Sequence, residues 1–181
     1  MLEITIPAME LYDDEKEEFV TNKTNQTIRL EHSLVSLSKW ESKWHKAFLT
    51  DEKKTHEEIV DYIKCMTLTQ NVDPVVYNFI DDRILNKIYS YIEDSMTATV
   101  FYNEEKKGGR KETVTSELIY YWMVALNIPF ECQKWHLNRL LTLIKVCTIK
   151  SQPAKKMSKR EIQSRNAALN AARRKKLNTK G

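Results

Sequence analysis

The strongest constraint on the fold is a series of helix-start signals, each followed by apolar residues at helical spacing. Two of these signals are capping boxes, in which a serine or threonine precedes a glutamate by three residues. They are Ser38 with Glu41, and Thr55 with Glu58. The apolar positions around them are spaced for one helix face and comprise Leu37, Trp40, Trp44, Ile59, Tyr62, Ile63 and Met66. We therefore expect two short amphipathic helices here, the first from about residue 36.

Three further helices are predicted on similar grounds. Asp73 is placed as an N-cap before Pro74, which suits the first helical position, and helical periodicity continues to about Asp94. A segment that starts at Ser116 and a segment opened by Pro129 each carry an apolar stripe. The first stripe is Leu118, Tyr121, Trp122 and Ala125; the second is Leu137, Leu140, Leu141 and Ile144, with Trp135 beside it in the expected core. We expect these two segments to form a helical hairpin at the centre of the core.

Strand patterning appears at the N-terminus and in one later segment. "LEITIP" alternates apolar and polar residues until Pro7, and "TIRLEHS" does the same after an acidic, Asn-rich connection, so two paired strands are expected. The segment "TATVFYNEEKKGGRKETVTS" surrounds Gly108 and Gly109 and favours a hairpin, with an exposed loop as the alternative. The predicted fold class is α+β and mainly α-helical, with a short N-terminal strand pair, about five helices and a basic C-terminal helical tail.

Charge divides the chain into a mainly helical globular domain over residues 1–150 and a basic tail over residues 151–181. The tail has six lysines and four arginines against one glutamate, a net charge of +9, whereas residues 1–150 have a net charge of −5. Ser158 and Glu161 form a third capping box, but the apolar line of the helix that follows, Ile162, Leu169 and Ala172, is thin. The tail is therefore either a solvated appendage or a helix that docks on another surface.

A basic tail of this kind is suited to a negative partner, which is nucleic acid, an acidic protein surface or the acidic face of a neighbouring copy. Its candidate contact residues are Arg165, Arg173, Arg174, Lys175 and Lys176, which can neutralise phosphates. The tail lacks the interleaved aromatic residues that stack on bases, so nucleic acid is the less favoured of these partners.

No catalytic, metal or cofactor site is predicted. The only glycines are at positions 108, 109 and 181, so the chain contains neither a phosphate-binding P-loop nor a dinucleotide-binding GxGxxG motif. Cys132 and His136 are four residues apart, but no second close pair completes a zinc site and no third group orients them for nucleophilic catalysis. Cys65, Cys132 and Cys147 lie in apolar helical patterns and are expected to be reduced core thiols. We therefore expect a protein that is not an enzyme.

The tryptophans leave two interpretations open. Trp40, Trp44, Trp122 and Trp135 fall at helical spacing, which is typical of core residues. The alternative is an apolar groove that receives a partner segment, and in that case Trp40 and Trp44 are the candidate contacts.

The sequence has no feature of a membrane or secreted protein. No run approaches the roughly 18 apolar residues of a membrane span. The acidic start, which contains Pro7, lacks a basic region followed by an apolar one. We expect a soluble, unsecreted protein with no membrane partner.

Four stretches of the sequence resemble a known family. They are "SLSKWESKWHKAFL", "EIVDYIKCM", "YYWMVALNIPFECQKWHLNRLLTLI" and "MSKREIQSRNAALNAARRKKLNTKG". They are similar to small proteins encoded in the structural gene clusters of tailed bacteriophages, the tail assembly chaperones, and the likeness covers most of the chain from about Leu37. The resemblance implies a chaperone in the host cytoplasm that coats the long, helical tape measure protein before the tail tube polymerises around it. The charge of the tail adds to this expectation: the tail contacts the acidic body of an adjacent copy or an acidic partner surface, so that several copies line up along the client.

One feature departs from that family. Tail chaperones are mainly helical, whereas this N-terminus is predicted to form strands. The departure leaves open a virion structural protein of the head, neck or tail, whose partners are other virion proteins. Nucleic-acid binding through the basic tail is a third class of function.

Overall fold

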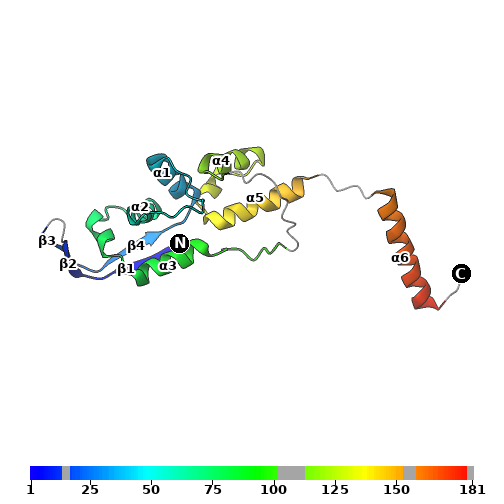
Figure 1. Ribbon diagram of the computed structural model, residues 1–181, viewed down its shortest axis with the longest axis horizontal. Coiled ribbons are helices and arrows are strands. Elements are labelled where there is room, and N and C mark those ends of the chain that lie inside the picture. Colours follow the sequence, from blue (N-terminus) through cyan, green and yellow to red (C-terminus); the bar gives the residue numbers. More distant parts are fainter. Residues whose placement is uncertain (14–16, 102–112, 153–157, 179–181) are drawn as a thin grey trace. The chain divides into compact units, whose positions relative to one another are not determined.

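The computed structural model describes residues 1–13, 17–101, 113–152 and 158–178. The chain divides into two compact units, Met1–Thr148 and Ile149–Gly181. The first unit contains four short strands and most of the helices, and the second contains the C-terminal helix (Figure 1). The fold is α+β and mainly helical, as predicted.

The strand pair expected from the alternating N-terminal patterns is present. β1 (Leu2–Ile6) pairs antiparallel with β4 (Gln26–Leu30), with Ile4 opposite Ile28. Alternate residues point to opposite faces of a strand. The inward positions are apolar and buried; they are Ile4, Ile6, Ile28 and Leu30. The single buried face therefore explains the alternation seen in the sequence.

A second strand pair lies in the connection between β1 and β4, where the sequence pattern predicts no strand. β2 (Met9–Asp13) pairs antiparallel with β3 (Glu18–Asn22), with Tyr12 opposite Phe19. It forms a two-stranded sheet separate from β1–β4. Val20 on one face packs against the core, while Tyr12 and Phe19 on the other face are exposed. The acidic residues of this stretch make it resemble a loop in the sequence.

Helix α1 (Leu34–Trp44) begins earlier than the capping-box pattern predicts. Its N-cap is Ser33, and the side chains of Ser33 and Ser36 each accept a hydrogen bond from the backbone N–H of the other. The predicted box of Ser38 with Glu41 is therefore wrong. A competing serine five residues upstream takes the cap and places Ser38 inside the helix.

Glu41 has a different structural role, which the sequence pattern does not reveal. It is buried, and its carboxylate accepts hydrogen bonds from the backbone N–H groups of Phe48 (2.9 Å) and Ser116 (2.7 Å). Buried backbone N–H groups without a partner are costly. Glu41 therefore ties the end of α1 to the loop that follows it and to the start of a helix much later in the chain.

The capping box predicted for the next helix is confirmed. In α2 (His56–Met66), the Thr55 hydroxyl accepts from the Glu58 N–H (3.2 Å) and the Glu58 carboxylate accepts from the Thr55 N–H (2.8 Å). The inward face of α2 includes Tyr62 and Met66, both buried.

The following helical region is two elements where one was predicted. Asp73 caps the 3₁₀ helix η1 (Pro74–Phe79), with Pro74 at the first position as expected. The chain then leaves helical geometry at Ile80. Asp81 provides a new N-cap, accepting from the N–H of Ile84 (2.7 Å), for α3 (Asp82–Glu93). Asp81 thus starts a second helix that periodicity alone merges with the first.

Helix α4 (Ser116–Ala125) starts where it was predicted, but its buried face is offset by one residue. Ile119 and Met123 are fully buried, whereas Tyr121 and Ala125 of the predicted stripe are exposed. Nearly every residue of α4 is apolar, so the pattern cannot distinguish its inner face from its outer one.

The segment opened by Pro129 is also divided. It forms the 3₁₀ helix η2 (Phe130–Lys134) and then α5 (Leu137–Ser151). Leu137, Leu140 and Ile144 are buried, but Leu141 is only half-buried, and so is Trp135. The predicted stripe is thus correct at three of its four positions.

Two hydrophobic clusters make up the core of the first unit. One lies between β1–β4, α2, η1 and α3, and α3 runs beside β1 (Figure 1). The other joins Ile119 and Met123 of α4 to the inward residues of α5. Helix α1 contributes to both, through Trp40 to the first cluster and through Leu34 and Leu37 to the second. α4 packs on α1, so α1, rather than an α4–α5 hairpin, links the core.

Most of the hairpin predicted around Gly108 and Gly109 lies outside the described residues. The flanking residues 97–101 and 113–115 are described and contain no strand.

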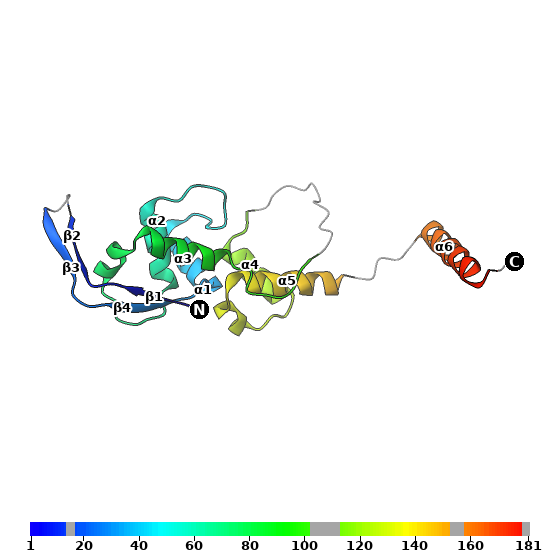
Figure 2. The same ribbon diagram turned by 90° about the horizontal axis from the view of Figure 1, so that it is seen from below.

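The second unit contains α6 (Lys159–Leu177) (Figure 2). Its described side chains are exposed, including Ile162 and Leu169 of the thin apolar line. The Glu161 side chain is outside the described set, so the third capping box stays a prediction. Among the described residues, no helix has both the length and the apolar character needed to cross a membrane.

Candidate partner-binding cleft

The two tryptophans predicted as partner contacts occupy different environments. Trp40 is only 1% exposed, and its indole N–H donates to the carbonyl oxygen of Glu58 (2.8 Å). Trp44 is half-buried, stacks on Trp40 at 6.1 Å between ring centroids, and donates to the Asp61 carboxylate (2.9 Å). Trp40 is therefore a core residue that a partner cannot reach in this structure, which corrects its assignment as a contact. Trp44 keeps an accessible edge.

Two ion pairs cover the Trp44 side of α1 and fix it to α2. Lys43 pairs with Asp61, and Lys46 pairs with Glu58 (2.6 Å). The hydrogen bond from Lys46 lowers the pKa of Glu58. Burial alone would raise the pKa of Asp61, but hydrogen bonds from Lys43 and Trp44 outweigh it and the net shift is downward. Both carboxylates are therefore held ionised, and the two ion pairs stabilise the packing of α1 and the residues after it on α2.

The aromatic packing continues from Trp40 into the loop after α1. The ring of Phe48 lies edge-on to Trp40 (5.0 Å between centroids) and stacks on Tyr62 of α2 (3.8 Å). The ammonium group of Lys54 lies 4.7 Å from the Phe48 ring centroid, within the range of a cation–π contact. Phe48 is thereby held in place by α1, α2 and the loop together.

A cleft of about 330 Å³ opens beside Phe48, between the loop, α2 and α3. Its floor and walls are apolar and consist of Phe48, Ile59, Tyr62, Ile63, Leu85, Ile88, Tyr89 and Ile92. Three charged residues of the loop, Glu52, Lys53 and Lys54, also line it. An apolar hollow with a few polar groups at its margin is the usual form of a binding site for an apolar side chain or helix face.

The sequence does not disclose this cleft. Phe48 follows the end of α1 in "HKAFLTDEKKT", where no periodicity continues. Tyr89 and Leu85 belong to α3, and only the packing of α3 against the loop and α2 brings them to Phe48. The one local signal is the pair Phe48 and Leu49 shortly after the end of α1. Two large apolar residues are unexpected in a loop that is otherwise polar.

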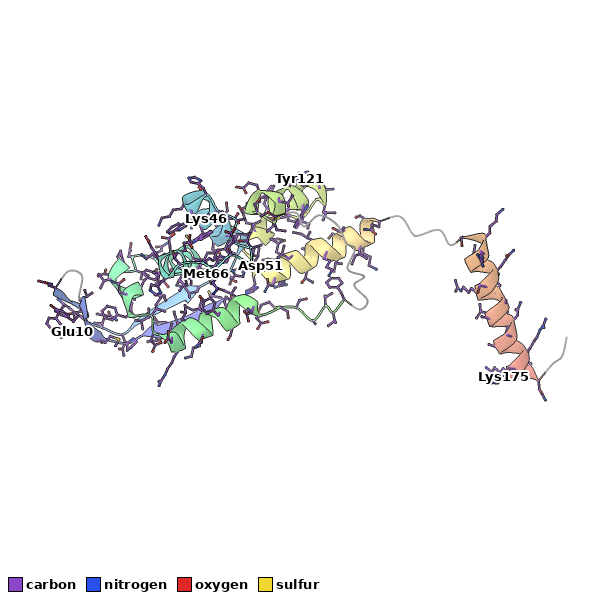
Figure 3. The ribbon with its side chains drawn as sticks, in the orientation of Figure 1. Glu10, Lys46, Asp51, Met66, Tyr121 and Lys175 are labelled. Carbon is purple, nitrogen blue, oxygen red and sulfur yellow. The ribbon has the colours of Figure 1, made fainter. Side chains whose placement is uncertain are left out.

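A second apolar surface lies on the outer side of α4. Tyr121 (Figure 3) and Val124 are exposed there, and Phe130 of η2 is exposed as well. Tyr120 and Phe130 approach each other at 6.4 Å between ring centroids.

The five basic residues predicted as contacts in the tail all lie on α6. Arg165, Arg173, Arg174, Lys175 and Lys176 are exposed. They are distributed over more than one side of the helix. Figure 3 shows Lys175 near the C-terminal end of α6. The structure thus separates the predicted contacts into a buried residue, a half-buried residue and a basic helix.

Cys132 and His136, the pair considered above as a metal site, are both buried. His136 is buried and donates from Nε2 to the carbonyl oxygen of Tyr91 (2.9 Å). No group of three or more His, Cys, Asp or Glu side chains suitable for a metal ion occurs among the described residues. Cys132 is a buried free thiol, and Cys65 and Cys147 are half-buried free thiols.

His136 instead belongs to a buried pair of histidines. The rings of His32 and His136 lie 5.2 Å apart, and His32 Nδ1 is 2.6 Å from the Tyr62 hydroxyl. Burial, with a smaller effect of His136 nearby, lowers the pKa of His32 to about 3, and burial also lowers the pKa of His136. Both imidazoles are therefore neutral at physiological pH.

No family model matches the chain, and no curated protein or solved structure matches it.

Proposed function

We propose that the protein is a bacteriophage tail assembly chaperone that binds an apolar helical segment of the tape measure protein in the cleft beside Phe48. The cleft is the observation that carries the proposal. It offers eight apolar lining residues in a space large enough for the side chains of one helix face. The bacteriophage context comes from the sequence resemblance.

The margin of the cleft adds a preference for charge. Lys53, Lys54 and Glu52 line the cleft and give it a net charge of +1, and Lys54 is already placed over the Phe48 ring. A client helix with an acidic residue beside its apolar anchors gains a favourable contact there, and charge of this kind sets orientation and encounter rate more than affinity. The preferred client is therefore an amphipathic helix with apolar anchors and a flanking carboxylate.

Co-expression of the chain with segments of a tape measure protein tests the proposal. We expect a segment that aggregates alone to stay in solution as a complex with the chain. We also expect the chain to be missing from purified virions, because a chaperone leaves its client. A fixed copy number in virions, with no effect on the tape measure segments, would support a virion structural protein of the head, neck or tail instead.

A single substitution at the cleft margin tests the site itself. Tyr89 lines the cleft and is 37% exposed, so Tyr89→Asp places a charge in the apolar wall without opening the core. Burying an unpaired charge is unfavourable. We expect at least tenfold weaker binding of a labelled tape measure peptide by fluorescence anisotropy, which corresponds to about 1.4 kcal/mol.

The matched control is Asn86→Asp. Asn86 is exposed on the same helix but outside the cleft, so this variant adds the same charge to α3 without changing the lining of the cleft. Binding by this variant should stay within about twofold of the unmodified protein. Equal weakening by both substitutions would place the client elsewhere on the molecule.

A further inference from the structure

The β2–β3 hairpin presents an unusual outer face. Tyr12 and Phe19 are cross-strand partners with ring centroids 5.0 Å apart, and they are 50% and 68% exposed. Glu10, two residues before Tyr12, lies on the same face, and its carboxylate accepts from the Thr21 hydroxyl (2.9 Å). The inner face of the hairpin packs on the core through Val20, whereas half or more of each aromatic side chain on the outer face is open to water. Its exposed aromatic pair therefore stands to gain from a covering partner.

The hairpin also accounts for the negative charge of the globular domain. Residues 9–22 contain six acidic residues and one lysine, a net charge of −5. The rest of residues 1–150 has 18 acidic and 18 basic residues and is neutral overall. The attraction of the domain for a basic partner is thus concentrated at one short hairpin (Figure 3, at Glu10).

Helix α6 carries the complementary chemistry on one face. Ile162, Arg165, Leu169, Arg173 and Lys176 follow one another at spacings of three or four, so they lie along one side of the helix. That side combines two aliphatic residues with three cations. Cations over aromatic rings and beside carboxylates are favourable contacts.

We propose that the outer face of the β2–β3 hairpin receives α6 of a second copy of this chain. Ile162 and Leu169 cover Tyr12 and Phe19, and the flanking cations face the acidic residues of the hairpin. The contact deepens the part of the proposed function in which copies line up on a client. Only the role of this contact in lining up copies on a client rests on the proposed function. The contact itself forms without a client.

The position of the hairpin favours a contact between copies. In both views the hairpin and the C-terminal part of α5 lie at opposite ends of the first unit (Figures 1 and 2). The C-terminal end of the first unit thus lies remote from the hairpin. A hairpin-to-tail contact uses two different surfaces, so it is heterologous and extends into a chain or ring of copies.

Sedimentation velocity of the full chain tests the proposal. The unmodified protein should associate with rising concentration at low salt and less at physiological salt, where exposed charges are screened over about 8 Å. Two variants remove one side of the contact each. They are Glu10→Lys with Glu17→Lys on the hairpin, and Arg173→Gln with Lys176→Gln on α6. Each should weaken self-association at least tenfold.

The matched control is Arg174→Gln with Lys175→Gln, which removes the same charge from the sides of α6 that lack Ile162 and Leu169. Its self-association should stay within about threefold of the unmodified protein. If both tail variants weaken self-association equally, the effect depends on net charge alone. That result would overturn the proposal that the face with Ile162 and Leu169 makes the contact.

Mixing the hairpin variant with the tail variant identifies the contact as intermolecular. One chain then supplies an intact tail and the other an intact hairpin, so we expect a species of two chains that does not grow further. Failure of the mixture to form this species would overturn the proposal, as would an unmodified protein that stays monomeric at low salt. Binding of labelled RNA that the tail variant loses, with self-association unchanged, would assign α6 to nucleic acid. None of these outcomes alters the client-binding test at Tyr89.

Discussion

Replacing Leu140 by alanine should lower the free energy of unfolding by about 2–5 kcal/mol, the range for a fully buried leucine in a well-packed core. Leu140 is 0% exposed and lies in the cluster that joins α5 to α4 and α1. The substitution removes apolar contacts within this cluster, and we expect it to leave a cavity there. Denaturant melts of the full chain measure the loss.

Leu141→Ala is the matched control, because it deletes the same atoms one residue along the same helix. Leu141 is half-buried at the edge of the cluster, so part of its side chain is already in water. We expect a loss of about 1–2 kcal/mol. Losses of equal size would mean that the predicted stripe, with Leu141 inside the core, describes α5 better than the structure does.

The elements that the sequence predicts well are those with local causes. The Thr55–Glu58 box and the Asp73–Pro74 start depend on hydrogen bonds and backbone angles within one turn, and both are present. The alternation of apolar and polar residues along β1 and β4 results from one buried face of the strand pair, and it can also be recognised within a few residues of sequence. The basic tail is visible as charge, and its helical propensity is visible as composition.

The errors arise where two local signals compete or where none exists. Ser33 and Ser38 both offer a cap, and the tertiary position of Glu41, bonded to Phe48 and Ser116, decides between them. In α4 the apolar residues surround the helix, so only its packing on α1 selects Ile119 and Met123 as the inner face.

The candidate cleft could not be predicted, because its residues come from three elements. Phe48 carries no helical pattern, and its neighbours Tyr62 and Tyr89 are more than a dozen residues away in the chain. Trp40 and Trp44 share a stripe in the sequence, yet only the burial of Trp40 under α2 separates core from surface. Pattern reasoning therefore found the aromatic region but not the hollow beside it.

The second large effect is expected from pH, and its origin is the buried pair of His32 and His136. His136 donates from Nε2 to a carbonyl oxygen, and its Nδ1 is buried with no hydrogen-bond partner among the described residues. His32 faces Tyr62 and His136, and the ring of Tyr91 lies 4.9 Å from that of His136. The Tyr91 hydroxyl donates to the Glu31 carboxylate (2.7 Å). Burial opposes a proton on either ring, and for His136 it outweighs the attraction of Glu31 and Asp94.

The sign of the pH effect follows from the lowered pKa values. The unfolded chain binds a proton at His32 near pH 6.5, whereas the folded chain does so only near pH 3. His32 therefore does not lower the free energy of unfolding above pH 6.5. As the pH drops below 6.5, the free energy of unfolding falls by about 1.4 kcal/mol per pH unit. Between pH 6.5 and 4.5 the loss from His32 alone should be about 2–3 kcal/mol, and His136 acts in the same direction.

The range from pH 6.5 to 4.5 distinguishes the effect of the histidines on stability from that of the acidic residues. Glu58 and Asp61 also have lowered pKa values, but the stability that they contribute is lost only below about pH 4.5, where carboxylates of the unfolded chain become protonated. Denaturant melts at pH 7.0, 6.0, 5.0 and 4.5 should thus show a slope that His32→Gln reduces, because glutamine gains no proton in either state. An unmodified protein whose stability is flat from pH 7 to 4.5 would mean that the histidine pair is protonated without cost and is open to water.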